Sequence, residues 1–135
     1  MPVTIFTDGG SRNNPGISGA GVVIYDGREK VSELSQFLGV RTNNWAEYEA
    51  VFLALEEAER LGLIDRDIEV KLDSKLVAEQ LSGRWKIKEP TLKPQAEKIR
   101  ASMLRFSSVV FIHIPREENS EADRLANDAM DRKVK

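Results

Sequence analysis

Four carboxylates stand where their side chains could converge on a metal ion. Asp8 and Asp73 each follow directly after an apolar run of strand-like composition. Glu47 and Asp123 each fall in the first turn of a segment with helical spacing. If the two strands are parallel neighbours, their acids emerge at one edge of the sheet, where ligands collect in open α/β sheets. Four carboxylates at one edge would repel each other and would not all stay ionised without cations.

The residue types around this pattern favour a hard cation. The chain has no cysteine and a single histidine, His113, so thiolate metal sites, disulfides and cysteine nucleophiles are excluded. Ligand sets made of oxygen alone suit Mg²⁺ or Mn²⁺ better than Zn²⁺. The acids therefore predict a magnesium or manganese site, on the condition that the fold brings them together.

Each acid also has an ordinary structural interpretation, which spacing alone leaves open. Asp8 precedes a glycine-rich turn and could bond its own backbone. Glu47 lies three residues after Asn44, close to a capping box, but it also lies on an apolar stripe, where an unpaired carboxylate is costly. Asp73 could cap the following helix, and Asp123 has capping-box spacing from a preceding serine.

The elements that must position these acids begin with three strands and a helix. Alternating β-formers separated by turn signals predict the strands, and apolar residues at helical spacing predict the helix, which a glycine ends. A dense turn signal fills residues 8–16. The predicted strands are Val3–Thr7, Gly19–Tyr25 and Glu29–Val40, and the predicted helix is Asn44–Leu61.

In the second half, strands and helices alternate. The predicted strands are Asp67–Leu72 and Ser108–Ile114, and the predicted helices are Ser74–Leu81, Thr91–Phe106 and Ser120–Lys133. An antiparallel start followed by this alternation predicts an α/β fold class with a mixed sheet and helices packed on it. A length of 135 residues suits one domain, 1–135.

Composition sets the broad class of the protein. Hydrophobic residues make up 41% and charged residues 31%, which is typical of a soluble globular chain. No signal peptide or transmembrane run is visible, so we expect a cytoplasmic protein with no membrane partner, and a monomer. The formal net charge of −2 counts mildly against nucleic-acid binding, although a metal-binding acid cluster would itself lower the total.

Four motifs resemble those of the type 1 ribonuclease H family. They occur in family order, span nearly the whole chain and are specific when taken together. They are Thr7–Ser11 with Asn14–Gly16, Thr42–Glu47, Leu72–Ser74 and Glu118–Ala126. The resemblance implies the ribonuclease H-like fold, a five-stranded mixed sheet with three antiparallel strands and then two parallel strands, flanked by helices.

The resemblance also implies an activity and a division of roles. The family hydrolyses the RNA strand of RNA/DNA hybrid duplexes, giving 5′-phosphate and 3′-hydroxyl ends, with two Mg²⁺ or Mn²⁺ ions per active site. Asp8 would bridge both ions, and Asp123 would help to hold the ion that activates water. Glu47 and Asp73 would hold the ion that stabilises the leaving 3′ oxygen.

Substrate contacts follow from the same resemblance. Backbone near three small residues would approach the RNA strand, three asparagines would lie in the minor groove, and a threonine would hold a phosphate of the DNA strand. These residues are Gly9, Gly10, Ser11, Asn14, Asn43, Asn44 and Thr42. Turn and cap chemistry is the alternative interpretation of the asparagines, and Asn44 could do both.

The chain departs from many family members at two places, and the resemblance is to a subgroup that lacks the basic protrusion. The corresponding stretch, Ser82–Pro90, is short, although Trp85 with its basic neighbours could contact substrate or simply pack. The loop before the fourth acid has no histidine, so Arg116 or Glu117 could assist product release. We interpret His113, inside a strand, as structural rather than as a proton shuttle.

Three alternatives remain beside a hybrid-specific nuclease. A broader nuclease of the same fold would also cut double-stranded RNA. A non-catalytic hybrid-binding module would have no need to retain all four acids. A structural domain would use the acids only as helix caps.

Overall fold

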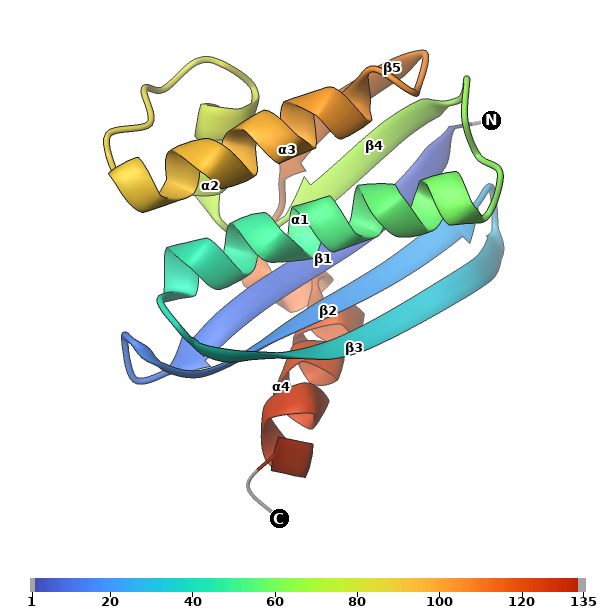
Figure 1. Ribbon diagram of the computed structural model, residues 1–135. Helices are drawn as coiled ribbons and strands as arrows, with labels where there is room; N and C mark the ends of the chain where they lie inside the picture. The colour runs from blue at the N-terminus through green and yellow to red at the C-terminus, as the bar shows by residue number, and fades with distance from the viewer. Residues whose placement is uncertain (1, 134–135) are drawn as a thin grey trace.

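The computed structural model describes residues 2–133 and has one five-stranded sheet with helices on both faces (Figure 1). The strands are β1 (Val3–Arg12), β2 (Gly16–Asp26), β3 (Glu29–Arg41), β4 (Asp67–Leu72) and β5 (Ser108–His113). The α-helices are α1 (Asn43–Arg60), α2 (Lys75–Leu81), α3 (Lys93–Met103) and α4 (Ser120–Lys133). Two short 3₁₀ turns are η1 (Pro90–Leu92) and η2 (Arg116–Glu118).

The sheet has the strand order β3-β2-β1-β4-β5. β1 and β2 pair antiparallel, as do β2 and β3, whereas β4 runs parallel to both β1 and β5. The predicted fold class and topology are therefore confirmed. The central strand β1 lies beside β4, so the strands that carry and precede Asp8 and Asp73 are parallel neighbours. The sequence argument required this arrangement.

β1 is longer than predicted. The turn expected from residue 8 onward is wrong for its first half, because the strand continues through Gly9 and Gly10 to Arg12. Pairing with β2 holds this extension: Gly9 faces Ala20 and Arg12 faces Ile17 across the ladder. The local turn preference of glycine is outweighed by the hydrogen bonds of a neighbouring strand. The reversal itself occupies residues 13–15.

The helices form two layers around the sheet. α1 and α3 cover one face, and α4 crosses the other face over β1, β2 and β3 (Figure 1). The core between α1, α3 and the sheet is mostly aliphatic, with Phe106, Phe111 and one tyrosine, whose hydroxyl donates to Gln80. Its largest fully buried members include Tyr48, Leu55, Ile5, Val22, Ile24, Ile68 and Ile99.

Two glycines set how closely the helices approach the sheet. A Cβ at Gly9 would clash with the backbone of Ala46 in α1, and a Cβ at Gly21 would clash with the carbonyl oxygen of Ala122 in α4. Glycine is required at such close approaches of two backbones. Both contacts lie next to a candidate acid, since Glu47 follows Ala46 and Asp123 follows Ala122.

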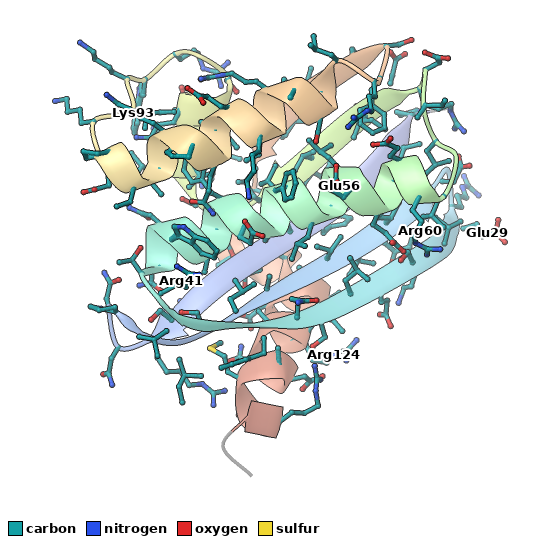
Figure 2. The ribbon with its side chains drawn as sticks, in the orientation of Figure 1. Glu29, Arg41, Glu56, Arg60, Lys93 and Arg124 are labelled. Atoms are coloured by element: carbon teal, nitrogen blue, oxygen red, sulfur yellow. The ribbon has the colours of Figure 1, made fainter. Side chains whose placement is uncertain are left out.

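Charged side chains lie on the outer surfaces, for example Glu56 and Arg60 on α1 and Arg124 on α4 (Figure 2). Among residues 2–133, no helix has both the length and the apolar composition needed to cross a membrane. The third helix is shorter than the predicted 91–106. Its N-terminal part is the separate turn η1, capped by the Glu89 side chain, and the chain leaves helical geometry after Leu104.

Candidate functional site

The first two acids meet because β1 and β4 are parallel and in register. Thr7 pairs with Leu72, so Asp8 and Asp73 are the next residue along each strand, at the same sheet edge. Together with Glu47 they form a cluster in which one oxygen from each carboxylate lies within 4.8 Å of the others. The topological convergence inferred from the sequence is present for these three residues.

Glu47 reaches the cluster from just beyond the first turn of α1, because the helix begins one residue earlier than predicted, at Asn43. The helix is capped by Thr42, whose hydroxyl accepts from the Trp45 amide at 3.2 Å. The capping-box alternative with Asn44 is therefore wrong. The Glu47 carboxylate instead accepts from the Gly9 amide at 2.5 Å, a contact allowed by the close approach of α1 to β1.

Asp73 is also not a helix cap. Ser74 fills that role, because its hydroxyl accepts from the Val77 amide at 3.3 Å. One carboxylate oxygen of Asp73 accepts from the side-chain amide of Asn119 at 3.4 Å. The side chain of Asp73 thus stays at the sheet edge and faces the other acids.

Asp123 is placed by a buried asparagine that the sequence analysis did not single out. Asn119 is 1% exposed, and its amide nitrogen donates to the Thr7 carbonyl at 2.9 Å. Its backbone carbonyl accepts from the Asp123 amide at 3.1 Å, at the start of α4. Asn119 therefore connects the middle of β1, the Asp73 carboxylate and the helix that carries Asp123. Asp123 lies outside the three-residue cluster but close enough to hydrogen-bond Asp8.

The electrostatics of the cluster are unfavourable without a cation. Burial, followed by the negative charges of Glu47 and Asp73, raises the pKa of Asp8 from 3.8 to about 10. Burial raises the pKa of Glu47 from 4.5 to about 7, although the hydrogen bond from Gly9 opposes this shift. At neutral pH the three carboxylates cannot all carry full charge by themselves.

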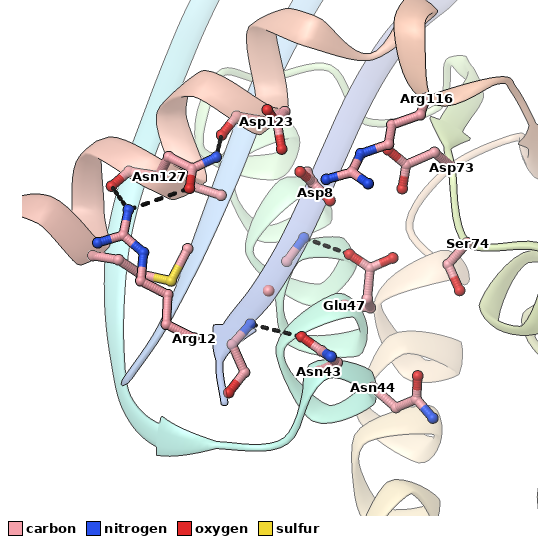
Figure 3. A pocket seen from close by; sticks show the side chains of 15 residues that line it. Asp8, Arg12, Asn43, Asn44, Glu47, Asp73, Ser74, Arg116, Asp123 and Asn127 are labelled. Atoms are coloured by element: carbon pink, nitrogen blue, oxygen red, sulfur yellow. Dashed lines mark hydrogen bonds between the residues drawn. The ribbon is translucent and has the colours of Figure 1, made fainter. Parts of the chain in front are cut away.

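The structure supplies no counter-charge in contact with this cluster. Among residues 2–133, the ion pairs do not include Asp8, Glu47 or Asp73. Arg116 points toward Asp8 and Asp73 from the loop before α4 (Figure 3). A group of close, buried carboxylate oxygens without an internal cation fits a divalent metal ion.

The acids line a cleft of about 540 Å³, which is larger than a metal site alone requires. Most of the residues predicted for the site line it. They are Asp8, Glu47, Asp73, Asp123, Gly9, Gly10, Ser11, Asn43, Asn44 and Arg116. The cleft lining does not include Asn14, Thr42, Glu117 or Trp85.

Three of the predicted substrate-binding residues are held by the protein itself. The Asn43 side chain accepts from the Ser11 amide at 2.7 Å, and Asn14 accepts from the Asn43 amide at 2.9 Å. The Thr42 hydroxyl caps α1. These bonds connect the β1–β2 turn to the start of α1, as the turn-and-cap interpretation of the asparagines expects for Asn14 and Asn43. Asn44 stays exposed at the cleft.

A second cleft lies beside Asn44. Its lining includes Trp85, which is 45% exposed, together with Arg84, Lys86 and Lys88. The ammonium group of Lys75 lies 5.9 Å from the centre of the Trp85 ring. The short stretch that replaces a protrusion therefore presents one aromatic ring among basic side chains. His113 is exposed at the end of β5 and is not part of either lining.

The cleft also contains residues that the sequence analysis missed, chiefly Arg12, Ser74 and Asn127. Arg12 and Asn127 could have been found from the sequence pattern. Arg12 shares the even-numbered face of β1 with Asp8 once the strand is extended. Asn127 lies one helical turn after Asp123, and its side chain donates to the Asp123 carbonyl at 3.0 Å.

Comparison with known proteins places this arrangement in a family. A family model described as reverse transcriptase-like matches residues 6–129. A bifunctional protein of Mycobacterium tuberculosis is 44% identical over 133 residues, covering 97% of this chain and 36% of that protein. Ribonuclease HI of Halobacterium salinarum is 40% identical over 130 residues, covering 96% of this chain and 64% of that protein.

Solved structures agree with the sequence matches. LC11-RNase H1, isolated from compost by a metagenomic approach, superposes with a TM-score of 0.94 at 46% identity, covering 99% of both chains. A second structure of LC11-RNase H1, in complex with an RNA/DNA hybrid, has a TM-score of 0.94 at 44% identity, covering 98% of this chain and 99% of that one. The chain spans about a third, 36%, of the Mycobacterium relative. With its sheet order and its four motifs, the chain belongs to the type 1 ribonuclease H family.

Proposed function

We propose that this chain is an endoribonuclease that hydrolyses the RNA strand of RNA/DNA hybrids and leaves 5′-phosphate and 3′-hydroxyl ends. The observation that carries the proposal is the cluster of Asp8, Glu47 and Asp73, with oxygens within 4.8 Å of one another and no ion pair to any of them within residues 2–133. A relative with 44% identity has been solved with an RNA/DNA hybrid bound, which supports the choice of substrate.

The donor set fits Mg²⁺ or Mn²⁺, and we propose two ions per active site. Asp8 would contribute to both, Glu47 and Asp73 to one, and Asp123 to the other. Bound divalent cations would lower the pKa of a water nucleophile and stabilise the leaving oxygen. The chain contributes the fixed carboxylates, whose positions are set by β1, β4, α1 and α4.

The residues at the end of β1 would give the RNA strand access to the acids. The amides of Gly9 and Ser11 already donate to Glu47 and Asn43, so they are not free to bind substrate. The contribution of this segment is therefore its shape. Gly10 has open space where a side chain would stand, and the backbone can approach the sugar closely.

Selection of RNA requires a group that reads the 2′-hydroxyl. We propose that Glu47 accepts from a 2′-hydroxyl, and that exposed Asn44 contacts the minor groove with its amide. Asn44 lines both clefts, so a duplex lying across it would place its second strand beside Trp85 and Lys86. That basic and aromatic surface suits a nucleic-acid backbone.

Arg116 would act on the phosphate after cleavage. Its side chain points toward the cleft from a loop with no histidine, and a guanidinium can bind a newly formed 5′-phosphate through several N–H donors. We propose that Arg116 assists product release. Glu117 is exposed and is not in the cleft lining, which makes it the weaker candidate of the two.

The test is cleavage of an end-labelled RNA/DNA hybrid by the purified chain in Mg²⁺ and in Mn²⁺, with Asp8→Asn as the matched control. Parallel reactions contain double-stranded RNA, single-stranded RNA and double-stranded DNA. We expect the wild-type chain to cut the RNA strand of the hybrid and none of the other substrates. We expect Asp8→Asn to leave the hybrid intact. Equal cutting of double-stranded RNA would establish the broader nuclease, and an intact hybrid under both metals would refute the proposal. The monomeric state and the cytoplasmic location stay predictions.

A further inference from the structure

A basic residue lines the acid cleft on the side opposite Arg116. Arg12 is the last residue of β1 and lies on the same face of that strand as Asp8, because side chains alternate along a strand. Figure 3 shows the Arg116 guanidinium between Asp8 and Asp73, and Arg12 farther along the cleft beside Asn127. Arg12 thus lines the cleft away from the position where a phosphodiester would be cut.

The Arg12 side chain is held in place by the last helix. Its Nη2 lies 2.6 Å from an oxygen of Asp131, 3.3 Å from Oδ1 of Asn127 and 3.4 Å from the Asn127 carbonyl oxygen. All of these contacts involve a single nitrogen. Nε and Nη1 of Arg12 have no hydrogen-bond acceptor among residues 2–133, so both can donate to a bound ligand.

We propose that Arg12 binds a phosphate of the RNA strand adjacent to the scissile phosphate, with Asp131 and Asn127 as the groups that orient it. This inference rests on the proposed function. Four residues along a strand separate Arg12 from Asp8, which is about 13 Å, so Arg12 reaches a neighbouring nucleotide rather than the reacting one. A guanidinium with one edge fixed and another edge free suits a phosphate.

The charge distribution around the cleft supports this assignment. The net charge of the chain is −2, and the four acids would repel a nucleic-acid backbone. A fixed cation beside them offsets that repulsion where the strand enters. A purely structural explanation is weaker, because the side chains of Arg12 and Asp131 are 39% and 56% exposed, and exposed ion pairs stabilise folded proteins little.

The experiment compares Arg12→Ala with Asp131→Ala, which break the same ion pair but differ in whether the cation remains. Steady-state cleavage of an RNA/DNA hybrid is measured over a range of salt concentrations. Arg12→Ala is expected to raise KM about tenfold with kcat nearly unchanged, and to reduce the slope of log KM against log salt by about 1. Asp131→Ala keeps the guanidinium but removes one of the groups that orient it, so its KM is expected to rise about threefold with the salt slope unchanged.

Arg105→Ala is the matched control, because Arg105 is a similarly exposed arginine that pairs with Glu59 at 3.0 Å and lines neither cleft. Its KM and salt slope should equal those of the wild type. Arg12→Lys should recover part of the KM and the full salt slope, because it restores the charge without the planar group.

Three results would overturn the inference, and they differ in what they mean for the proposed function. Equal kinetic effects of Arg12→Ala and Asp131→Ala would mean that only the tie between β1 and α4 matters. An unchanged KM and salt slope in Arg12→Ala, with a wild-type chain that cuts the hybrid, would remove the phosphate contact and leave the proposed function intact. A wild-type chain that does not cut the hybrid would overturn both.

Discussion

Helix α1 carries two buried glutamates, Glu47 near its start and Glu57 in its last turn, and each is 8% exposed. Glu57 has partners: Arg60 donates to both carboxylate oxygens at 2.7 Å, and Ser32 donates at 2.6 Å. The hydrogen bonds from Arg60 lower the pKa of Glu57. Glu47 lies beside two more acids, and burial raises its pKa to about 7.

Burial alone therefore does not distinguish a structural carboxylate such as Glu57 from a functional one such as Glu47. A buried charge is tolerated when the protein supplies the opposite charge, as at Glu57. At Glu47 the fold brings negative groups together without an ion pair to the carboxylate among residues 2–133, so we expect a cation from outside the chain to compensate the charge. Four predictions test this contrast, in order of expected effect.

The largest effect is expected from Asp8→Asn on hybrid cleavage. The substitution keeps the shape of the side chain but removes the charge at the centre of the cluster, so we expect a loss of activity of about 10³-fold or more. Rates with labelled hybrid in Mg²⁺ and in Mn²⁺ measure it. A variant within tenfold of wild type would mean that Asp8 holds no essential ion.

The same substitution should stabilise the metal-free protein. The pKa of Asp8 is raised in the folded state, so the folded state binds more protons than the unfolded state between pH 3.8 and about 10. Stability of the wild type in chelator should therefore fall as pH rises through this window. Asp8→Asn should be more stable by about 2 kcal/mol at pH 8, and the gain should shrink toward pH 4.

Urea unfolding in chelator at several pH values measures this difference. Adding Mg²⁺ or Mn²⁺ should stabilise the wild type and have much less effect on Asp8→Asn, because ligands that bind the folded state raise its stability. The interpretation of the cluster as uncompensated would be contradicted by an Asp8→Asn variant that is less stable than wild type at pH 8.

A cation introduced beside Glu47 should make the site resemble the Glu57 region. Asn44→Arg places an arginine three residues from Glu47, the same separation as between Glu57 and Arg60. We expect about tenfold weaker divalent-ion binding, since the new charge competes with the ion. Calorimetric titration with Mn²⁺ measures it. Asn44→Ala is the control for loss of the amide, and equal affinity in the two variants would reject the idea.

The smallest effect is expected from Glu57→Gln. The pKa of Glu57 is lowered in the folded state, so its contribution is present above the unfolded value of 4.5 and is lost as pH falls through the folded value. Glu57→Gln should cost about 1 kcal/mol at pH 7 and much less at pH 3, with hybrid cleavage unchanged. A loss of cleavage, or a stability loss that persists at low pH, would contradict the interpretation of Glu57 as a structural carboxylate stabilised by Arg60.

Sequence reasoning predicted a mixed sheet from the order of the elements, and the meeting of Asp8 with Asp73 on the condition that their strands are parallel neighbours. The five-stranded arrangement itself was implied by the family resemblance. Sequence reasoning could not decide whether Glu47 caps a helix, since the answer depends on the Gly9 amide, 38 residues away in the chain. It placed a turn where β1 continues, because pairing with β2 is not visible in local composition. Asn119 was missed for the same reason: its partner Thr7 is 112 residues distant.

The docking of α4 across Gly21 has a consequence for the timing of activity during synthesis. Three of the four acids precede residue 74, whereas Asp123 belongs to a helix that packs on β2 and is joined to β1 through Asn119. A growing chain that has not yet released this segment from the ribosome lacks one wall of the cleft. If Asp123 is required as proposed, the chain cannot cut a hybrid until α4 folds onto the sheet.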